Sequence, residues 1–339
     1  MSIPVITFFN NKGGVGKTSL VYHISWMFAE LGVRVMAVDL DPQANLTAAF
    51  IPEDGLEDIW PEGPHPQTIA GAVAPLQKGI GDVDVQLTST HGIMDRLFLI
   101  AGDLSISNFE DDLSAVWPKC LERDERAFRV TSAFWRVMQR AAEMKSCEVI
   151  LVDVGPNLGA INRAVLISSD YVVVPLSPDL FSLQGLRNLG PRLRDWREGW
   201  TERLAKNPDA SLKLPSGKIQ PIGYCVQQHS VRLDRPVQAY DKWIRQIPNV
   251  YRRSVLGLDQ AKSDIAVDKD PNCIALVKHY RSLMPMAQQA RKPMFDLRPA
   301  DGALGAHFQA AQQAFKDFSK ITNSIASKAG IAIATSTLF

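Results

Sequence analysis

The sequence lacks several features that mark secreted, metal-stapled or membrane proteins. It has only four cysteines, Cys120, Cys147, Cys225 and Cys273, and no two are close enough for a CxxC pair. Scattered thiols of this kind are typical of the reducing cytosol. No stretch approaches the roughly 20 apolar residues of a membrane span, and the start, MSIPVITFFNN, has no basic segment of a signal peptide. We therefore expect a soluble, cytoplasmic protein.

A strong overall charge is also missing, since the formal net charge is +1. The chain as a whole is therefore not a polyanion binder by bulk charge. The charge is distributed unevenly, however. Residues 181–292 carry 20 basic and 10 acidic residues, whereas the rest of the chain carries 17 and 26. This asymmetry indicates either a surface that faces a polyanion or solvated helix faces, and the sequence leaves both readings open.

What the sequence does contain is a repeated alternation of apolar strands and amphipathic helices. Short runs rich in β-branched residues predict strands, and longer segments with helical periodicity predict helices. The predicted strands cover 3–9, 33–40, 97–101, 148–155, 171–178 and 219–226, with 246–248 near the end of another, and the predicted helices cover 18–31, 128–145, 183–196 and 307–325. This order predicts an α/β fold with a doubly wound, mostly parallel sheet and helices on both faces. We expect one domain over 1–339, with a Pro/Gly-rich excursion at 51–81.

The segment NNKGGVGKTS, Asn10–Ser19, lies between the first predicted strand and the first predicted helix. Glycines allow successive backbone N–H groups to converge on phosphate oxygens, and the helix that follows adds its positive end. Lys17 is then expected to contact the β- and γ-phosphates of ATP, and the Thr18 hydroxyl to bind Mg²⁺. The standard pattern has glycine where Asn11 stands, and the alternative is a plain glycine turn. The predicted cofactor-binding residues are Lys12, Gly13, Gly14, Val15, Gly16, Lys17, Thr18 and Ser19.

Three aspartates stand at or just after the ends of predicted strands, where an open parallel sheet binds its ligands. Asp153 is expected to approach Mg²⁺, and Asp41 is a candidate to orient the attacking water. Asp39 is expected to support either the metal or the loop. The alternative for all three is helix capping or turn formation.

Several of these segments resemble the ParA/MinD family of ATPases. KGGVGKTS is similar to its deviant phosphate loop, VDLDPQAN to its switch I and VILVDVGPNLG to its metal strand and switch II, while SSDYVVVPLSPDLFSLQGLRNL and PMAQQARKPMFDL resemble later segments. The resemblance implies that Lys12 contacts phosphates held by a second subunit and that Asp41 is catalytic. It further implies ATP-dependent homodimerisation and slow, Mg²⁺-dependent hydrolysis. Gly155 replaces a proline common in the family, which we expect to loosen switch II.

The same resemblance predicts partners. A ParA-like protein would position or segregate a cargo such as a plasmid, a chromosome region or a protein complex, with a ParB-like or adaptor protein as activator. Because no helix-turn-helix precedes the first strand, we expect non-specific rather than operator-specific DNA binding. Phosphate contacts would come from basic side chains. The candidates are Arg232, Arg235, Arg252 and Arg253.

Two assignments are less specific. Gln227 and Gln228 follow a late strand and are candidates for adenine recognition, with exposed loop amides as the alternative. The terminal helix has few basic residues, so core packing is favoured over the membrane contact made by the C-terminal helix of MinD proteins.

Two other functional classes stay open. One is a nucleotide-gated regulator or defence-system subunit that acts through protein partners. The other is a metabolic or redox ATPase resembling the nitrogenase iron protein, although Cys120 and Cys147 lack the expected local setting.

Overall fold

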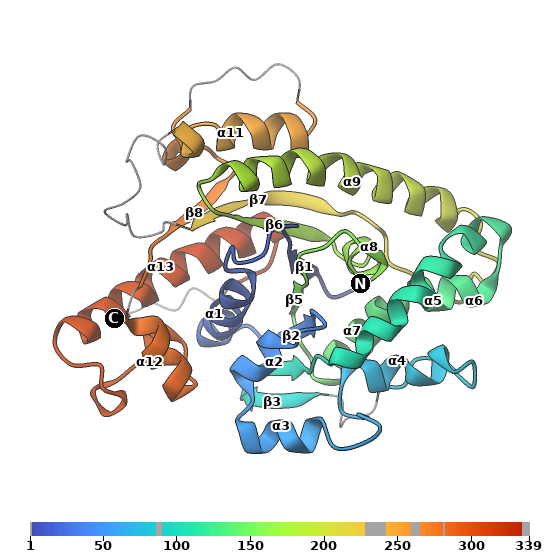
Figure 1. Cartoon of the computed structure of the whole chain (residues 1–339), viewed down its shortest axis with the longest axis horizontal. Helices are drawn as coiled ribbons and strands as arrows, with labels where there is room; N and C mark the ends of the chain where they lie inside the picture. The colour runs from blue at the N-terminus through green and yellow to red at the C-terminus, as the bar shows by residue number, and fades with distance from the viewer. Residues whose placement is uncertain (1, 86–89, 228–241, 259–264, 281, 334–339) are drawn as a thin grey trace.

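The computed structural model of the chain describes residues 2–85, 90–227, 242–258, 265–280 and 282–333. Its centre is an eight-stranded sheet with the order β3-β4-β2-β5-β1-β6-β7-β8 (Figure 1). Only β3 runs antiparallel to its neighbour, and the other pairs are parallel. The predicted α/β class and mostly parallel sheet are confirmed. The strands are β1 (Val5–Phe8), β2 (Val35–Leu40), β3 (His91–Met94), β4 (Leu97–Ile100), β5 (Val149–Val154), β6 (Tyr171–Leu176), β7 (Gln220–Gln227) and β8 (Cys273–Val277).

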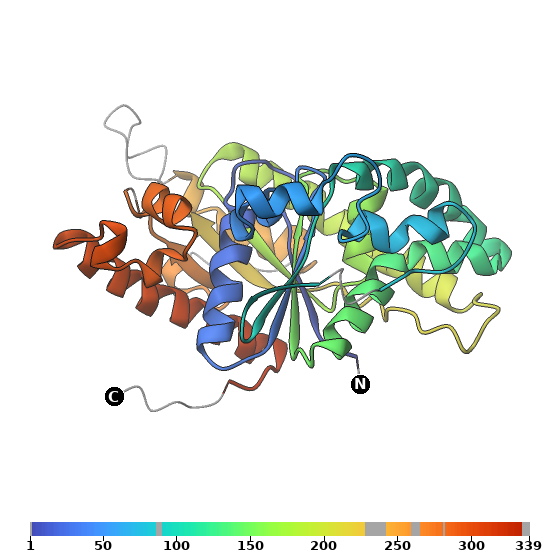
Figure 2. The ribbon, with the colours of Figure 1, turned by 90° about the horizontal axis from the view of Figure 1, so that it is seen from below.

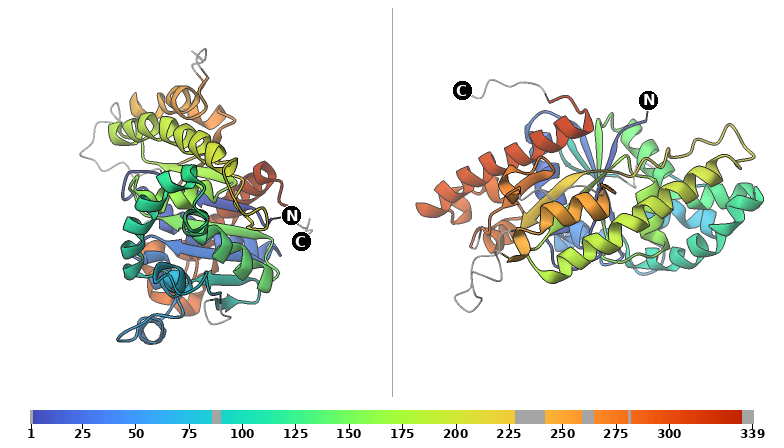
Figure 3. Two further views of the ribbon diagram at one scale, coloured as in Figure 1. Left: turned by 90° about the vertical axis from the view of Figure 1, so that its right-hand side faces the viewer. Right: turned by 90° about the horizontal axis from the view of Figure 1, so that it is seen from above.

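Helices cover both faces of this sheet. Figure 2 shows the strands between two groups of helices, and the right-hand view of Figure 3 separates α13 from α9 across the sheet. The helices are α1 (Lys17–Glu30), α2 (Asn45–Phe50), α3 (Glu53–Ile59), α4 (Ile69–Gln77), α5 (Phe109–Val116), α6 (Glu125–Thr131), α7 (Ala133–Met144), α8 (Ala160–Ile167), α9 (Leu180–Leu204), α11 (Ile247–Val250), α12 (Leu283–Ala290) and α13 (Ala306–Ala329).

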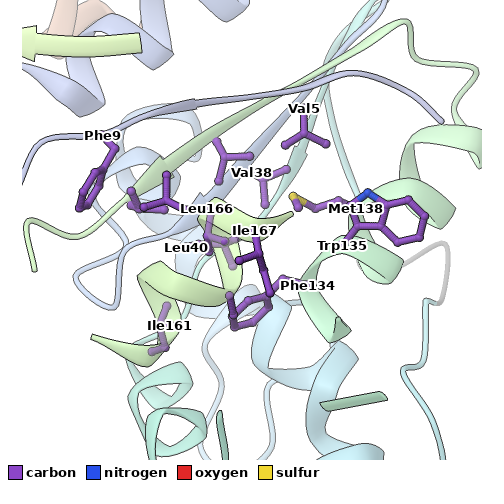
Figure 4. Close-up of a cluster of buried hydrophobic side chains, with 14 of the residues drawn as sticks. Val5, Phe9, Val38, Leu40, Phe134, Trp135, Met138, Ile161, Leu166 and Ile167 are labelled. Carbon is purple, nitrogen blue, oxygen red and sulfur yellow. The ribbon is translucent and has the colours of Figure 1, made fainter. Parts of the chain in front are cut away.

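The alternation of side chains along each strand produces two cores. Val5 and Val38 face one side, where they pack with Phe134 and Met138 of α7 in the cluster drawn in Figure 4. Ile6 and the other strand residues on its face of the sheet point to the opposite side, where they pack against α1 and α13. Because the central strands are buried on both faces, they consist of almost continuous apolar runs.

The structure corrects two expectations about individual segments and adds elements that the sequence did not predict. Residues 246–248 begin the helix α11 rather than ending a strand, and the helix expected over 128–145 is divided at Ser132 into α6 and α7. Strand β8 was not predicted. The excursion at 51–81 contains helices α3 and α4, and α4 buries Ile69, Ala72, Val73 and Leu76 in the core.

The terminal helix α13 packs its apolar face against the core, as the sequence favours. Phe318, Ile321 and Ile325 are buried there. Within the described ranges, we find no helix that combines the length and the apolar character needed to cross a bilayer.

The strand order brings distant loops to one edge of the sheet. Asp39 of β2 lies directly opposite Asp153 of β5, and Asp153 also pairs in register with Phe8, the last residue of β1, which ends two residues before Asn10 of the glycine loop. The carboxyl ends of β1, β2 and β5 therefore place the glycine loop and the acidic residues side by side.

Candidate functional site

The glycine loop adopts a backbone that requires glycine at two positions. Gly14 and Gly16 have φ angles of 71° and 75°, in the left-handed region that other residues enter only at a cost. The loop leads directly into α1, whose first residue is Lys17. The Lys17 side chain is buried, and its Nζ lies 3.4 Å from the carbonyl oxygen of Lys12. The loop thus curves around its own lysine.

Burial lowers the pKa of Lys17, while the nearby carboxylates of Asp153 and Asp41 act in the opposite direction. A phosphate group placed beside Lys17 would supply further negative charge to the same ammonium. This is the electrostatic setting that a phosphate-binding lysine requires.

A cavity of about 690 Å³ opens over this loop. It is formed by the phosphate loop, by one face of α1, by the turn after β2 together with α2, and by α12. The lining residues include Gly13, Gly14, Gly16, Lys17, Thr18, Ser19, Tyr22, His23, Asp41, Ala48, Ala49, Met284, Ala287, Gln288 and Arg291. The volume and the mixture of polar and apolar side chains in the lining suit a nucleotide.

Asp153 is the buried carboxylate of the site. Neither of its oxygens accepts a hydrogen bond of normal geometry from a described residue, although the Thr18 hydroxyl is near enough to lower its pKa. Burial, reinforced by the charge of Asp39, raises the pKa of Asp153 to about 8. A buried carboxylate without partners is costly, so Asp153 fits a site for a cation.

The described residues contain no group of three or more His, Cys, Asp or Glu side chains arranged to hold a metal on their own. Mg²⁺ does not need such a group, because one or two carboxylates together with substrate phosphates and water hold it. Asp153 and the neighbouring Thr18 fit this kind of site.

Asp39 has a different role. One carboxylate oxygen accepts hydrogen bonds from both the backbone N–H and the hydroxyl of Thr47, each at 2.8 Å, and the other accepts from Asp41 N at 3.3 Å. Of the two predicted alternatives, these contacts favour support of the loop and α2 over direct metal binding. Burial raises the pKa of Asp39 to about 7 despite these bonds.

Asp41 lies at the edge of the cavity. Its Oδ1 accepts a hydrogen bond from Gln43 N at 3.0 Å, so the carboxylate is held by its own turn. Gly155 of the loop after β5 lies so close that a Cβ added there would stand 3.4 Å from Asp41 Oδ1. The loops that carry Asp41 and Gly155 therefore touch beside the phosphate loop.

Residues of the loop after β5 are connected to the neighbouring helices. Asn162 of α8 donates to the carbonyl oxygens of Gly155 and Asn157, each at 2.7 Å. The first backbone N–H groups of α8, those of Ala160 and Ile161, donate to the carboxylate of Glu110 on α5. The sequence predicted that Gly155 makes this loop more flexible. The hydrogen bonds from Asn162 restrain the loop and oppose that effect.

Lys12 is separate from the cavity wall formed by the described residues. Its ammonium instead pairs with Asp179, the residue that precedes α9. The loop lysines therefore differ, since Lys17 is buried and lines the cavity, whereas Lys12 is held by Asp179 outside it.

The candidates for base recognition are placed differently from expectation. Gln227 lies against the phosphate loop, where a Cβ added to Gly16 would be 2.5 Å from Gln227 Nε2, and it does not line the cavity described above. Gln228 falls outside the described residues. Sequence reasoning missed the wall formed by α12 and the contribution of Tyr22 and His23. Their spacing from Ser19, three and four residues along a helix, is the signal that could have found them.

The basic residues divide into two groups. Arg187, Arg192, Arg245 and Arg253 are exposed. Arg252 is buried and donates to Asp270 at 2.9 Å, so its assignment to DNA is corrected: its charge is satisfied inside the protein. Arg232 and Arg235 fall outside the described residues.

The cysteines give no support to a redox ATPase. Cys120, Cys147 and Cys225 are buried, and burial raises the pKa of each thiol. A cluster shared between subunits would need thiols at the surface.

Comparison with known proteins agrees with this geometry. A family model described as an AAA domain matches residues 3–206. Protein IncC of Escherichia coli is 29% identical over 255 residues, which cover 75% of this chain but only 59% of IncC.

Two solved structures share the fold over nearly the whole chain. A variant of McdA from Cyanothece, in complex with ATP, has a TM-score of 0.60 and 13% identity, with 99% of each chain covered. A plasmid partition protein from Borrelia burgdorferi has a TM-score of 0.52 and 14% identity, with 97% of this chain and 100% of that chain covered.

Proposed function

The chain belongs to the ParA/MinD-type family of P-loop ATPases, and from this premise we propose that it is an ATPase that dimerises with ATP to position or segregate a cargo. The observation that carries the proposal is the meeting of Lys17, Thr18, Asp41 and the unpartnered Asp153 at one edge of the sheet. A glycine turn without a function would not need a buried lysine facing two buried acids.

The phosphate end of the cavity would hold the triphosphate of ATP. Backbone N–H groups of the loop and the Lys17 ammonium would bind the phosphates, and Thr18 with Asp153 would hold Mg²⁺, which neutralises phosphate charge when bound. Asp39 would keep α2 and the Asp41 turn in place. Asp41 would orient the attacking water toward the γ-phosphate.

Lys12 would act on a second copy of the chain. In this structure it precedes the lining residue Gly13, does not itself line the cavity and pairs with Asp179. Its side chain is partly exposed, so it could contact a phosphate held by a facing subunit, and that contact would make dimerisation depend on ATP. Hydrolysis would be slow without an activating partner, because Asp41 and Gly155 lie on loops that a partner can order.

DNA is the proposed surface on which the dimer acts. Arg187 of α9 and Arg253 are exposed, and the turn that carries Arg253 packs on α9, where Ser254 contacts Gly190. Such contacts would be independent of sequence and sensitive to salt. A ParB-like protein or cargo adaptor is the proposed activator.

The test is phosphate release with ATP and Mg²⁺, measured together with ATP binding. We expect wild type to turn over slowly and Lys17→Ala to lose most ATP binding, because the main phosphate cation is gone. Asp41→Ala should bind ATP and release no phosphate. Hydrolysis by Asp41→Ala at the wild-type rate would show that another group orients the water.

A further inference from the structure

Arg291 joins two segments that lie far apart in the sequence. It directly follows α12, and its Nη1 donates to the carbonyl oxygen of Ile51 at 2.6 Å and to that of Ala48 at 3.4 Å. Ala48 belongs to α2, and Ile51 is the residue that follows this helix. Carbonyl groups in the last turn of a helix have no partner within the helix, and a positive charge is favourable there. Arg291 therefore caps the C-terminal end of α2 from a neighbouring helix.

The backbone of Arg291 is strained. Its φ angle is 49°, in the left-handed region. Glycine is the preferred residue at this position after a helix, because a residue with a Cβ enters this region only at a cost. The strain of an observed outlier points to a function for the side chain that causes it. The contact with α2 supplies such a function.

Helix α2 depends on contacts of this kind because it has only six residues. Isolated helices of this length do not form in water, so packing decides where α2 lies. Thr47 ties one side of the helix to Asp39. The ring of Phe50 packs on Tyr22 of α1, with ring centres 4.7 Å apart. Arg291 adds a third tie, which comes from α12.

A short hydrogen-bonded turn connects α2 to Asp41. The backbone N–H of Ala48 donates to the carbonyl oxygen of Ala44 at 3.1 Å, and the N–H of Ala44 donates to the carbonyl oxygen of Asp41 at 2.8 Å. The carbonyl group of Ala48 is in turn held by Arg291. A shift at the C-terminal end of α2 would therefore move the turn that carries Asp41.

We propose that Arg291 is a positioning residue for hydrolysis, which fixes α2 from the side of α12 and thereby holds the Asp41 carboxylate where it orients the attacking water. This inference rests on the proposed ATPase function. Arg291 lines the same cavity as Asp41. Its Nη1 is engaged by carbonyl groups of α2, however, so the assigned role acts through α2 and not through contact with the nucleotide.

The test uses two substitutions that differ in backbone strain. Arg291→Ala removes the guanidinium and keeps a Cβ, whereas Arg291→Gly removes both. We expect each to lower kcat for ATP hydrolysis roughly tenfold and to change KM by less than about twofold, because a misplaced group acts on the chemical step. Arg291→Gly should have the higher Tm of the two, since glycine adopts this φ angle without strain. If stability alone governed turnover, the more stable variant would hydrolyse ATP faster.

Two further variants make the kinetic result specific. Arg291→Lys keeps a cation that can donate to the same carbonyl groups, and it should retain most of the wild-type kcat. Arg298→Ala removes a guanidinium that is 71% exposed and lies a few residues further along the chain. It should leave kcat unchanged.

Hydrogen exchange reports on the contact without any need for activity. The amides of Ala48 and Ile51 donate within α2 and at its end, to the carbonyl oxygens of Ala44 and Thr47. In Arg291→Ala without nucleotide, both amides should exchange faster than in wild type, because the last turn of α2 is released. In Arg291→Lys they should remain largely protected.

The outcomes separate this inference from the proposed function. A folded Arg291→Ala with the wild-type kcat, or with unchanged exchange of the α2 amides, overturns the positioning role and leaves the ATPase proposal intact. A raised KM with an unchanged kcat also overturns it, since Arg291 would then contribute to nucleotide binding. If wild type releases no phosphate from ATP, the proposed function itself fails, and the positioning role fails with it even where exchange shows that Arg291 holds α2.

Discussion

Asp179 contacts two parts of the molecule with its two carboxylate oxygens. Oδ1 accepts a hydrogen bond from Ser182 N at 2.9 Å and caps α9, while Oδ2 pairs with the Lys12 ammonium. The start of α9 therefore holds the lysine that we propose for the partner's phosphates. Transfer of Lys12 to a second subunit requires that this pair separate.

Removing the charge of Asp179 should make dimerisation easier. Asp179→Asn retains an oxygen that can cap α9 and no longer attracts Lys12. Both side chains are about 26% exposed, and such partly exposed pairs are worth about 0.2–1 kcal/mol. We expect the ATP concentration at half-dimerisation to fall by roughly 1.4- to 5-fold. Light scattering over an ATP titration measures it.

The matched control for this experiment is Asp195→Asn, which removes an equal charge from an exposed position on the same helix. It should leave the midpoint unchanged. A midpoint in Asp179→Asn equal to that of wild type would mean that the Lys12 pair does not oppose dimerisation.

The sequence predicted the phosphate loop because its information is local. Three glycines, Lys17 and Thr18 lie within six residues, between a strand and a helix. It also placed Asp39 and Asp153 at the ends of predicted strands, where a parallel sheet binds its ligands, but only the strand order shows that the two lie opposite each other. Lys12 and Asp179 are 167 positions apart in the sequence. No pattern of residue spacing could have predicted that their side chains form an ion pair.

The missed and misjudged segments have physical reasons as well. In α4, Gly71 and Pro75 suggest a turn, but Ile69, Ala72, Val73 and Leu76 have helical spacing and packing against the core decides the outcome. In the sequence, Arg252 belongs to a pair of adjacent basic residues. Its ion-pair partner Asp270 is 18 positions away, and no sequence pattern indicated that the two lie together. Buried charges of this kind are set by tertiary structure rather than by composition.

Gly14 and Gly16 both have a left-handed backbone, but they differ in the space available for a side chain. Alanine substitutions at the two positions can therefore be compared. Gly14→Ala meets nothing within 4 Å, whereas a Cβ at Gly16 meets Gln227 Nε2 at 2.5 Å. Both substitutions cost about 1–2 kcal/mol for the left-handed backbone. We expect Gly16→Ala to lower the free energy of unfolding further and to weaken ATP binding more, as urea denaturation and ATP titration would show.

A second-site variant checks the cause of that difference. Gln227→Ala added to Gly16→Ala should recover part of the loss, because it removes the side chain that the new Cβ strikes. Equal losses in Gly14→Ala and Gly16→Ala would mean that Gln227 does not constrain the loop.

The buried acid predicts a specific dependence of stability on pH. The pKa of Asp153 is raised from its ordinary value of 3.8 to about 8, so the folded protein favours the protonated carboxyl. Its stabilising effect is complete below about pH 4 and is lost as the pH rises toward about 8. Without nucleotide, the Tm of wild type should therefore fall more over this range than that of Asp153→Asn.

Mg²⁺ and ATP should oppose this trend, because a metal ion binds the carboxylate and not the acid. The affinity of wild type for Mg²⁺ with ATP should accordingly rise between about pH 6.5 and 8.5. Parallel Tm curves for wild type and Asp153→Asn would show that Asp153 does not titrate in this range.

Exposed arginines on and beside α9 should govern DNA binding. Arg187→Glu with Arg253→Glu should weaken binding of the ATP-bound dimer to random duplex DNA and reduce the slope of log affinity against log salt, because phosphate contacts are lost. ATP affinity should not change. Fluorescence anisotropy at several salt concentrations measures both quantities.

The control is Lys119→Glu, which changes the charge by as much as one of the two arginine substitutions, on an exposed residue in the turn after α5. It should weaken DNA binding less than Arg187→Glu alone or Arg253→Glu alone. If the double variant binds DNA as wild type does, the basic excess in residues 181–292 is a solvated surface.

The most direct test of the account is the molar mass in solution with each nucleotide. Light scattering should give the monomer of 37.5 kDa without nucleotide and with ADP, and twice that mass with ATP and Mg²⁺. Asp41→Ala should remain a stable dimer with ATP, and Lys12→Ala should bind ATP and remain a monomer. A wild-type protein that binds ATP but stays monomeric, or a Lys12→Ala variant that dimerises as wild type does, would contradict the account.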